Sequence, residues 1–402
     1  MSYDACMSAE IADYHWLTSD EAAPLLRDLQ QQLMAAGQVD VRLAASLRKS
    51  HSATRTHLLL EQVELRGRSR DKFADPSELF FTRKGLEQCT DEWLAKAKAV
   101  RFPSGQSIAD ICCGIGGDAL ALAARGPLVA WDIDPVAAHF ARCNLGRRGF
   151  EQSAVKQETA GVAAMKDVAR WHIDPDRRAT GERAIQMEDY EPGPQLLKEL
   201  LRANPHGCVK IAPAAEVTVA QFPECEREWL GSRGECRQQV LWFGGLGRHA
   251  GKHVATLVNR QGEAVSYIGE PNLPLTPAAQ IGANVYEPDA TILAAQLAGA
   301  LADEHECEAV TTGGGYLTSD RLLAHPLVES FRVRDVLPYD LRKLKAYCRA
   351  HRLGQLEIKK RGVDLQPHFV RRQIIGVGDE AAVIFITPVG GSVRAIVAER
   401  LR

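Results

Sequence analysis

The stretch IADICCGIGGDALALAARGPLVAWDID, residues 108–134, decides the fold. An apolar run ends at Cys112, and the turn that follows contains Gly114, Gly116 and Gly117. Glycines allow a sharp turn and a close approach of the backbone to a ligand, because they lack a Cβ atom. The alanine- and leucine-rich segment after the turn predicts a helix, and the next apolar run predicts a second strand. The stretch therefore predicts a βαβ unit with a ligand site at its glycine turn.

Strand and helix patterns continue to alternate after this unit. Seven segments have strand character, and they are SIADIC (107–112), LVAWD (128–132), AVK (154–156), ARWHI (169–173), CVKIA (208–212), QVLWF (239–243) and VATLV (254–258). With helical patterns between them, they predict an α/β fold, a doubly wound, Rossmann-like sheet of seven strands over residues 101–263. The connection Gly244–Lys252 is too short for a helical crossover, so we expect the last strand to be antiparallel.

Three further segments complete the predicted organisation. Residues 1–100 have helical spacing of leucines and predict a helical N-terminal segment. Residues 264–285 contain three prolines and little periodicity, and we interpret them as a linker. Residues 286–402 mix helical and strand patterns, which predicts a compact α+β domain.

Bulk composition limits the class of protein. The chain of 402 residues has a formal net charge of −2, so any nucleic-acid surface has to be local. The start, MSYDACMSAEIADYHW, lacks the apolar core of a signal peptide, and no apolar run is long enough to cross a bilayer. Ten cysteines are scattered without a C-x-x-C pair. We therefore expect a cytoplasmic protein with no membrane partner and no metal, and the sequence identifies no protein partner.

Carboxylates around the glycine turn indicate the charge of the ligand. Gly114, Gly116 and Ala119 also match the dinucleotide pattern G-x-G-x-x-A, which keeps a nicotinamide-dependent oxidoreductase open as an alternative. A pyrophosphate binds best at the positive end of a helix, and Asp110 and Asp118 at that end would repel it. They suit the ammonium and sulfonium of S-adenosylmethionine, which we predict as the cofactor.

The second predicted strand ends at Asp132, which lies 18 residues after Gly114. A carboxylate at this place can accept hydrogen bonds from both hydroxyls of a ribose. Cys112 and Gly117 complete the predicted cofactor turn. We add Glu158, in VKQET after the third predicted strand, as a further candidate for the cofactor site. Burial of Cys112 is the simpler interpretation of its small side chain.

ADICCGIGGDALALA and WDIDPVAAHFARCN resemble the cofactor motifs of class I methyltransferases, in particular those of the group around trimethylguanosine synthase. Further blocks, including FFTRKGLEQCT, VKIAPA, WFGGL, VLPYDLRKLKAYCR and IKKRGVD, resemble a bacterial family with a class I domain followed by a THUMP-like domain. The resemblance spans roughly residues 70–390. It implies an S-adenosylmethionine-dependent enzyme with cofactor contacts at Asp110, Gly114, Gly116, Asp132 and Asp134.

The fourth predicted strand ends in HIDPDRR, where class I methyltransferases place the methyl acceptor. Asp174 and Pro175 match the start of the D-P-P-Y type of motif found in amine-directed members, and we predict them as catalytic. Asp176 and Arg177 replace the second proline and the aromatic residue, which leaves the methylated atom open. Arg177 and Arg178 could bind a phosphate of the substrate, or pair with Asp174 to hold the loop.

A basic segment lies near the C-terminus. Residues 321–372 contain 13 Lys or Arg against 5 Asp or Glu, which favours a polyanion-binding surface over a merely solvated helix face. We predict contacts to RNA, with tRNA and rRNA as candidates, from Lys343 on a predicted helix and from Lys359, Lys360 and Arg361 at the end of a predicted strand. The predicted function is RNA methylation. A non-catalytic RNA-binding scaffold with a vestigial methyltransferase fold is a further alternative.

Overall fold

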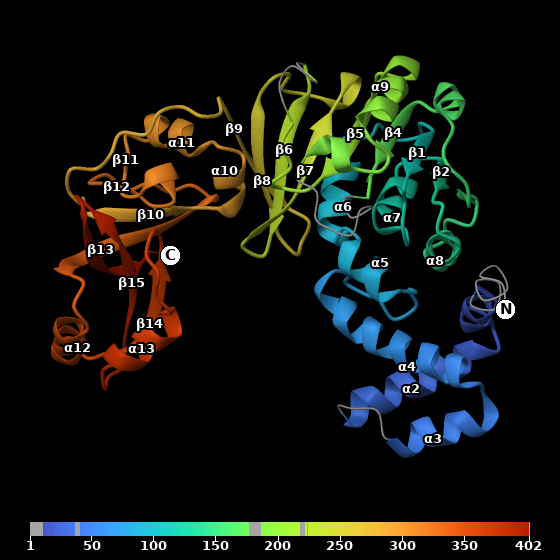
Figure 1. Cartoon of the computed structure of the whole chain (residues 1–402), viewed down its shortest axis with the longest axis horizontal. Helices are drawn as coiled ribbons and strands as arrows, with labels where there is room; N and C mark the ends of the chain where they lie inside the picture. Colours follow the sequence, from blue (N-terminus) through green and yellow to red (C-terminus); the bar gives the residue numbers. More distant parts are fainter. Residues whose placement is uncertain (1–10, 37–40, 177–185, 218–221, 223, 402) are drawn as a thin grey trace. The chain divides into compact units, whose positions relative to one another are not determined.

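The structure is a computed structural model that describes residues 11–36, 41–176, 186–217, 222 and 224–401. The chain, drawn as a ribbon in Figure 1, divides into two compact units. The segments of the first unit are Met1–Cys225, Val240–Arg248 and Val258–Glu263, and those of the second are Glu226–Gln239, His249–Leu257 and Ala264–Arg402. Across the described ranges, no helix combines the length and the apolar character needed to cross a membrane.

Helices dominate the chain before residue 100, as the leucine spacing predicts. They are α2 (Ala22–Ala36), α3 (Val41–Ser50), α4 (Ala53–Arg68), the 3-10 turn η1 (Ser69–Asp71), α5 (Arg83–Gln88) and α6 (Glu92–Ala99). Side-chain caps begin the last two, since Thr82 accepts from the backbone N–H of Gly85 and Asp91 from that of Leu94. Helices α2 to α5 share one hydrophobic core with Ile115 of the glycine turn, so they support that turn directly.

A sheet of nine strands carries the glycine turn. The strands are β1 (Ile108–Ile111), β2 (Leu128–Trp131), β3 (Ala154–Lys156), β4 (Arg170–Ile173), β5 (Gly207–Ile211), β6 (Glu226–Ser232), β7 (Glu235–Trp242), β8 (His253–Val258) and β9 (Ala264–Gly269). Their order is β3-β2-β1-β4-β5-β7-β6-β8-β9, and β1 to β5 pair in parallel. This is the doubly wound order that brings the ends of β1 and β4 together at one edge.

Three helices of the first unit accompany the parallel strands. They are α7 (Gly117–Ala123), α8 (Pro135–Arg147) and α9 (Pro194–Ala203), with 3-10 turns η2 (Val162–Asp167), η3 (Met187–Asp189) and η4 (Gly244–Leu246). Strand β1 is buried along its whole length, which explains its apolar run. The chain from β2 into α8 turns at Asp134, which caps α8 ahead of Pro135.

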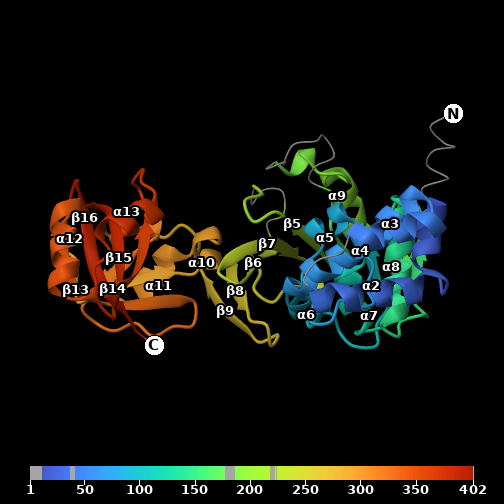
Figure 2. The ribbon, with the colours of Figure 1, turned by 90° about the horizontal axis from the view of Figure 1, so that it is seen from below.

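The sheet has nine strands and not the predicted seven. The two additional strands are β6 and β9, which the sequence does not predict. Strand β6 places Glu226 and Glu228 in the interior, where His249 N–H and Thr256 Oγ1 donate to them. Acidic residues at buried positions hide the apolar signal of a strand. Figure 2 shows β6, β8 and β9 in a row. The last predicted strand is β8, and it pairs with β6 in parallel. It is therefore not antiparallel to β6, the strand beside it, although the sequence predicts an antiparallel last strand.

The segment expected as a linker, residues 264–285, contains β9 at its start. Strand β9 is the edge strand of the sheet, and most of its side chains are exposed, with Tyr267 buried. A mostly exposed edge strand lacks the apolar periodicity that identifies strands in a sequence, which explains the difference.

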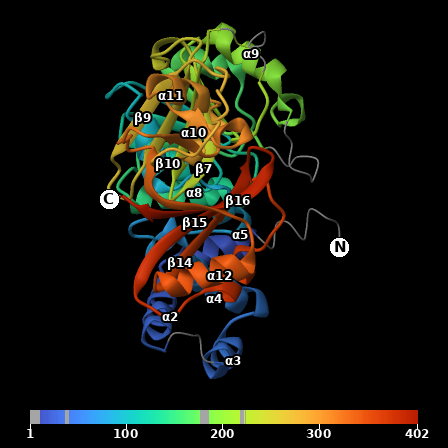
Figure 3. The same ribbon diagram turned by 90° about the vertical axis from the view of Figure 1, so that its left-hand side faces the viewer.

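The C-terminal part has the expected α+β class. Its strands are β10 (Asn284–Pro288), β11 (Glu308–Ala309), β12 (Leu317–Ser319), β13 (Val328–Pro338), β14 (Leu353–Lys360), β15 (Glu380–Val389) and β16 (Ser392–Arg400). Its helices are α10 (Ala290–Ala294), α11 (Ala298–Glu304), α12 (Leu341–Ala350) and α13 (Pro367–Ile374), with the 3-10 turn η5 (Thr312–Gly314). The strands form one sheet in the order β11-β12-β10-β13-β16-β15-β14. Helices α12 and α13 pack beside each other against this sheet, as Figure 3 shows for α12 and β14.

Candidate functional site

The glycine turn joins β1 to α7 through three residues in the left-handed region, Cys112, Gly114 and Gly116. A Cβ atom at Gly114 would meet nothing within 4 Å, so this part of the backbone borders open space. At Gly116 a Cβ would lie 3.4 Å from Ala141 Cα, and at Gly117 it would lie 3.0 Å from Cys89 Cβ. The glycines thus differ: Gly114 leaves room for a ligand, and the other two allow close packing.

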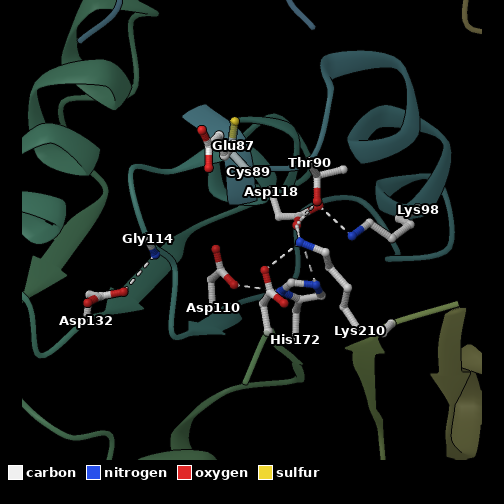
Figure 4. Close-up of polar contacts among 12 residues, drawn as sticks. Glu87, Cys89, Thr90, Lys98, Asp110, Gly114, Asp118, Asp132, His172 and Lys210 are labelled. Atoms are coloured by element: carbon white, nitrogen blue, oxygen red, sulfur yellow. Dashed lines mark hydrogen bonds and ion pairs between the residues drawn. The ribbon is translucent and has the colours of Figure 1, made fainter. Parts of the chain in front are cut away.

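Asp132 ties the glycine turn to the end of β2. Its Oδ2 accepts a hydrogen bond from the backbone N–H of Gly114 at 2.8 Å (Figure 4). Its Oδ1 accepts from the N–H of Asp134 at 2.9 Å. Burial raises the pKa of Asp132, and these two hydrogen bonds oppose that shift. Asp134 itself is exposed, and its carboxylate accepts from Val136 N–H and Ala137 N–H at the start of α8. The structure therefore brings Gly114 and Asp132 together as the spacing predicts.

Asp110 lies below the turn and pairs with His172, at 2.7 Å between Oδ1 and Nδ1. The parallel register of β1 and β4 sets these two residues side by side, and both side chains are buried. Burial raises the pKa of Asp110, and His172 partly offsets the shift. Within the described ranges, Asp110 Oδ2 and His172 Nε2 are buried without a hydrogen-bond partner.

Asp118, in the first turn of α7, is committed to protein partners. Its Oδ1 lies 2.7 Å from Lys98 Nζ, and its Oδ2 accepts from Thr90 Oγ1 at 2.7 Å (Figure 4). Burial would raise the pKa of Asp118, but Lys98, His172 and Lys210 together lower it well below its ordinary value. The sequence predicts that Asp118 faces a cationic ligand, but in the structure Lys98 and Lys210 already balance its negative charge.

Asp174 follows β4 at the edge of the sheet, beside Lys210 of β5. Lys210 Nζ donates to Asp174 Oδ2 at 2.5 Å and lies 3.9 Å from Asp118 Oδ2. Burial would lower the pKa of Lys210, but Asp174 and Asp118 raise it above its ordinary value. Asp176 lies 3.4 Å from Lys84 Nζ on α5. Pro175 lies between the two aspartates, and the predicted substrate residues Arg177 and Arg178 lie outside the described residues.

The sequence motifs do not single out Lys98, His172 and Lys210, which the structure places beside Asp118, Asp110 and Asp174. Each interrupts an apolar segment, in WLAKAKA, RWHI and GCVKI respectively. A charged or titratable side chain within a buried run is rarely tolerated without a partner, so these interruptions were the available signal. The partner of each lies far away in the chain, which a sequence pattern does not reveal.

Two other predicted cofactor residues have different surroundings. Glu158 is exposed, and its Oε1 lies 3.9 Å from Lys156 Nζ. Burial raises the pKa of the Cys112 thiol well above its ordinary value, which keeps it protonated and makes it a poor nucleophile. Within the described chain, no group of three or more His, Cys, Asp or Glu side chains is arranged to hold a metal ion.

The four basic residues predicted to contact RNA divide into two pairs. Lys343 on α12 and Lys360 at the end of β14 are exposed, without an ion pair among the residues that the structure describes. Lys359 pairs with Glu287 and lies 3.3 Å from Glu329 Oε2. Arg361 lies 3.7 Å from Glu287 Oε1, with its guanidinium over the ring of Tyr316. The second pair of cations is largely neutralised by these acids.

Known proteins are similar to the C-terminal part of the chain and to the chain as a whole. A family model described as THUMP domain-like matches residues 328–400. A Mycobacterium tuberculosis protein, named an uncharacterized S-adenosylmethionine-dependent methyltransferase, is 30% identical over 353 residues, which is 85% of this chain and 95% of that protein. A crystal structure from Porphyromonas gingivalis W83, provisionally named a methyltransferase, superposes with a TM-score of 0.74 at 18% identity over 98% of both chains. The structural likeness supports the fold, and the relative of 30% identity establishes the family.

Proposed function

This chain belongs to the S-adenosylmethionine-dependent methyltransferases, and we propose that its methyl acceptor is RNA held by the C-terminal unit. The family model for a THUMP-like domain matches this unit over residues 328–400. THUMP domains present RNA to attached modifying enzymes, so the match supports RNA by analogy. Nothing in the comparisons supports a nicotinamide-dependent oxidoreductase or a non-catalytic scaffold.

The surroundings of the glycine turn fit S-adenosylmethionine. Open space borders Gly114, and Asp110 keeps a buried carboxylate oxygen without a hydrogen-bond partner in the described ranges, which suits a cationic ligand. We assign the ribose hydroxyls to Asp132, whose two oxygens each retain accepting capacity beyond the hydrogen bonds from Gly114 N–H and Asp134 N–H. Asp118 would act indirectly, because Lys98 and Thr90 already occupy its carboxylate.

When bound, S-adenosylmethionine supplies an electrophilic methyl group, so that the acceptor atom bonds to the methyl carbon as the sulfur–carbon bond breaks. The protein's contribution to such a transfer is mainly alignment of the acceptor. Asp174 lies at the end of β4, at the sheet edge where ligands bind in this fold, with its side chain partly exposed. We propose that Asp174 accepts a hydrogen bond from the acceptor and that Pro175 stiffens the turn that carries it.

Exposed cations on α12 and α13 are the observation that carries the RNA proposal. They are Arg342, Lys343, Lys345, Arg349, Arg371 and Arg372. None of them forms an ion pair with an acidic side chain in the described part of the chain, so their charge faces solvent. Phe369 on α13 is 45% exposed, and an exposed aromatic ring among cations is a stacking surface for an RNA base. We assign RNA contacts to this face and to Lys360, and a structural role to Lys359 and Arg361.

The proposal includes a cytoplasmic location, where RNA and S-adenosylmethionine are both available. The cysteines that the structure describes are free thiols, which suits a reducing compartment.

Methyl transfer from radiolabelled S-adenosylmethionine to total tRNA and rRNA tests the proposal. We expect label in RNA with the wild type, and a strong loss with Lys343→Glu/Lys345→Glu/Arg371→Glu. Lys198→Glu is the control, because Lys198 is an exposed lysine of α9 outside the helix pair. Label in protein or small molecules but not in RNA would refute RNA as the acceptor.

A further inference from the structure

Four ionisable side chains at and around the first turn of α7 form a run of alternating charge. In order they are Lys98, Asp118, Lys210 and Asp174, and the nearest nitrogen–oxygen distances between successive members are 2.7, 3.9 and 2.5 Å. Side-chain exposure increases along the run, from 2% at Lys98 through 8% and 11% to 32% at Asp174. The run therefore begins in the core and ends at the partly exposed carboxylate of Asp174. Figure 4 shows the side chains of Lys98, Asp118 and Lys210 directed toward one another.

Regular elements hold most members of this run. Lys98 lies on α6 and Asp118 in the first turn of α7, and these two helices pack against each other. Lys210 lies in β5, whose parallel register with β4 pairs Val209 with Ile173. The same register, continued by one residue, places Lys210 beside Asp174. A site residue held by neighbours on helices and strands has less freedom than its loop position suggests.

Because the charges alternate, each buried charge in the run has a neighbour of opposite sign. Removing an ammonium or a carboxylate from water is costly, and close partners of opposite charge offset much of that cost. Lys210 has a carboxylate on each side, Asp118 toward the core and Asp174 toward the sheet edge. Asp118 is in turn held by Lys98 and Thr90. Loss of one member would leave its neighbours with unbalanced buried charge.

We propose that Lys210 is a positioning residue for methyl transfer, which holds the Asp174 carboxylate in one orientation toward the acceptor and is itself anchored by Asp118 and Lys98. This inference rests on the proposed function, in which Asp174 faces the acceptor. Lys210 occupies Oδ2 of Asp174, which leaves Oδ1 to accept a hydrogen bond. The acceptor is therefore a group that carries an N–H or O–H at or beside the atom that is methylated.

A double-mutant cycle on methyl transfer to RNA tests the inference, using Lys210→Met, Asp174→Asn and the combined variant. Because a misplacement of about 1 Å can cost about 100-fold in rate, we expect Lys210→Met to lower kcat by about 100-fold. The affinity for S-adenosylmethionine should stay unchanged, and Lys210→Arg should restore most of the rate. The combined variant should be no slower than the slower single variant, because both remove the same arrangement. Lys198→Met makes the same chemical change on exposed α9 and should leave kcat unchanged.

The same cycle measured by urea unfolding, without cofactor or RNA, provides an independent readout. We expect non-additive losses in the free energy of unfolding, since the two side chains contact each other. Additive losses in both kcat and unfolding would overturn the role of Lys210. A wild type that transfers no methyl group to RNA would instead overturn the proposed acceptor, and the unfolding cycle would still decide whether Lys210 holds Asp174.

Discussion

The backbone N–H of Gly114 donates a hydrogen bond to the carboxylate of Asp132 across 2.8 Å. This hydrogen bond joins the first glycine of the β1–α7 turn to the residue that ends β2, so two successive sequence motifs become one site. It also fixes the carboxylate beside the open space that borders Gly114. Asp132 therefore lies beside open space, whereas Asp118 is held by protein partners, and substitutions at the two positions should have different effects.

Asp132→Ala should weaken binding of S-adenosylmethionine by about 10- to 100-fold, the usual worth of hydrogen bonds to a charged group. Isothermal titration of both proteins measures the change. Asp167→Ala removes an exposed carboxylate elsewhere in the same unit and serves as the control. Equal affinity of wild type and Asp132→Ala would remove the assigned ribose contact.

Asp118→Ala should destabilise the first unit by about 3–5 kcal/mol, because it leaves the buried ammonium of Lys98 without its partner. Asp118→Ala/Lys98→Met should recover much of that loss, since it removes both charges. Urea unfolding of the three proteins checks both statements. If the double variant were less stable than Asp118→Ala, the buried ion pair would not be the source of the effect.

His139 on α8 predicts a pH dependence of stability. Burial lowers the pKa of His139, and electrostatic repulsion from His15 and Arg142 lowers it further, to about 4. The unfolded chain therefore binds more protons than the folded protein between about pH 4 and pH 6.5, so stability rises with pH over this window. His139→Gln should remove about 1 kcal/mol of that rise, a value reduced for partial exposure.

Unfolding free energies of the wild type and His139→Gln at pH 5 and pH 7 measure this effect. The comparison uses the difference between the two pH values, so an overall loss of stability in the variant does not matter. An unchanged pH dependence in His139→Gln would show that His139 is not the titrating group.

The two groups of C-terminal cations predict different outcomes for RNA binding. Lys343→Glu/Lys345→Glu should weaken binding and reduce the slope of log affinity against log salt by about 0.7 for each phosphate that the variant no longer neutralises. Lys359→Met should leave that slope unchanged and lower stability instead, because Lys359 is held by Glu287 and Glu329. Filter binding at several salt concentrations, with unfolding as the second measurement, separates the two. A reduced slope with Lys359→Met would place Lys359 in the RNA surface.

The sequence alone determined the βαβ unit and its glycine turn, because both depend on local spacing. Glycines at 114 and 116 and the carboxylate at Asp132 follow a strand–turn–helix–strand pattern that only nearby residues specify. The α+β class of the C-terminal part followed from alternating patterns in the same way. Strand β6 was not predicted, because acidic residues such as Glu226 and Glu228 are typical of a surface. Only the structure shows that both are buried with hydrogen-bond partners.

Only the tertiary structure decided how the charges of the site are balanced. The sequence places Asp110 and Asp118 beside the turn as free acceptors of a cation, and folding brings His172 to the first and Lys98 to the second. Lys210 reaches Asp174 because β4 and β5 lie in parallel register, although 36 positions separate the two residues. Electrostatic interactions depend on distance in space and on burial, and neither quantity is contained in the order of residues along a chain.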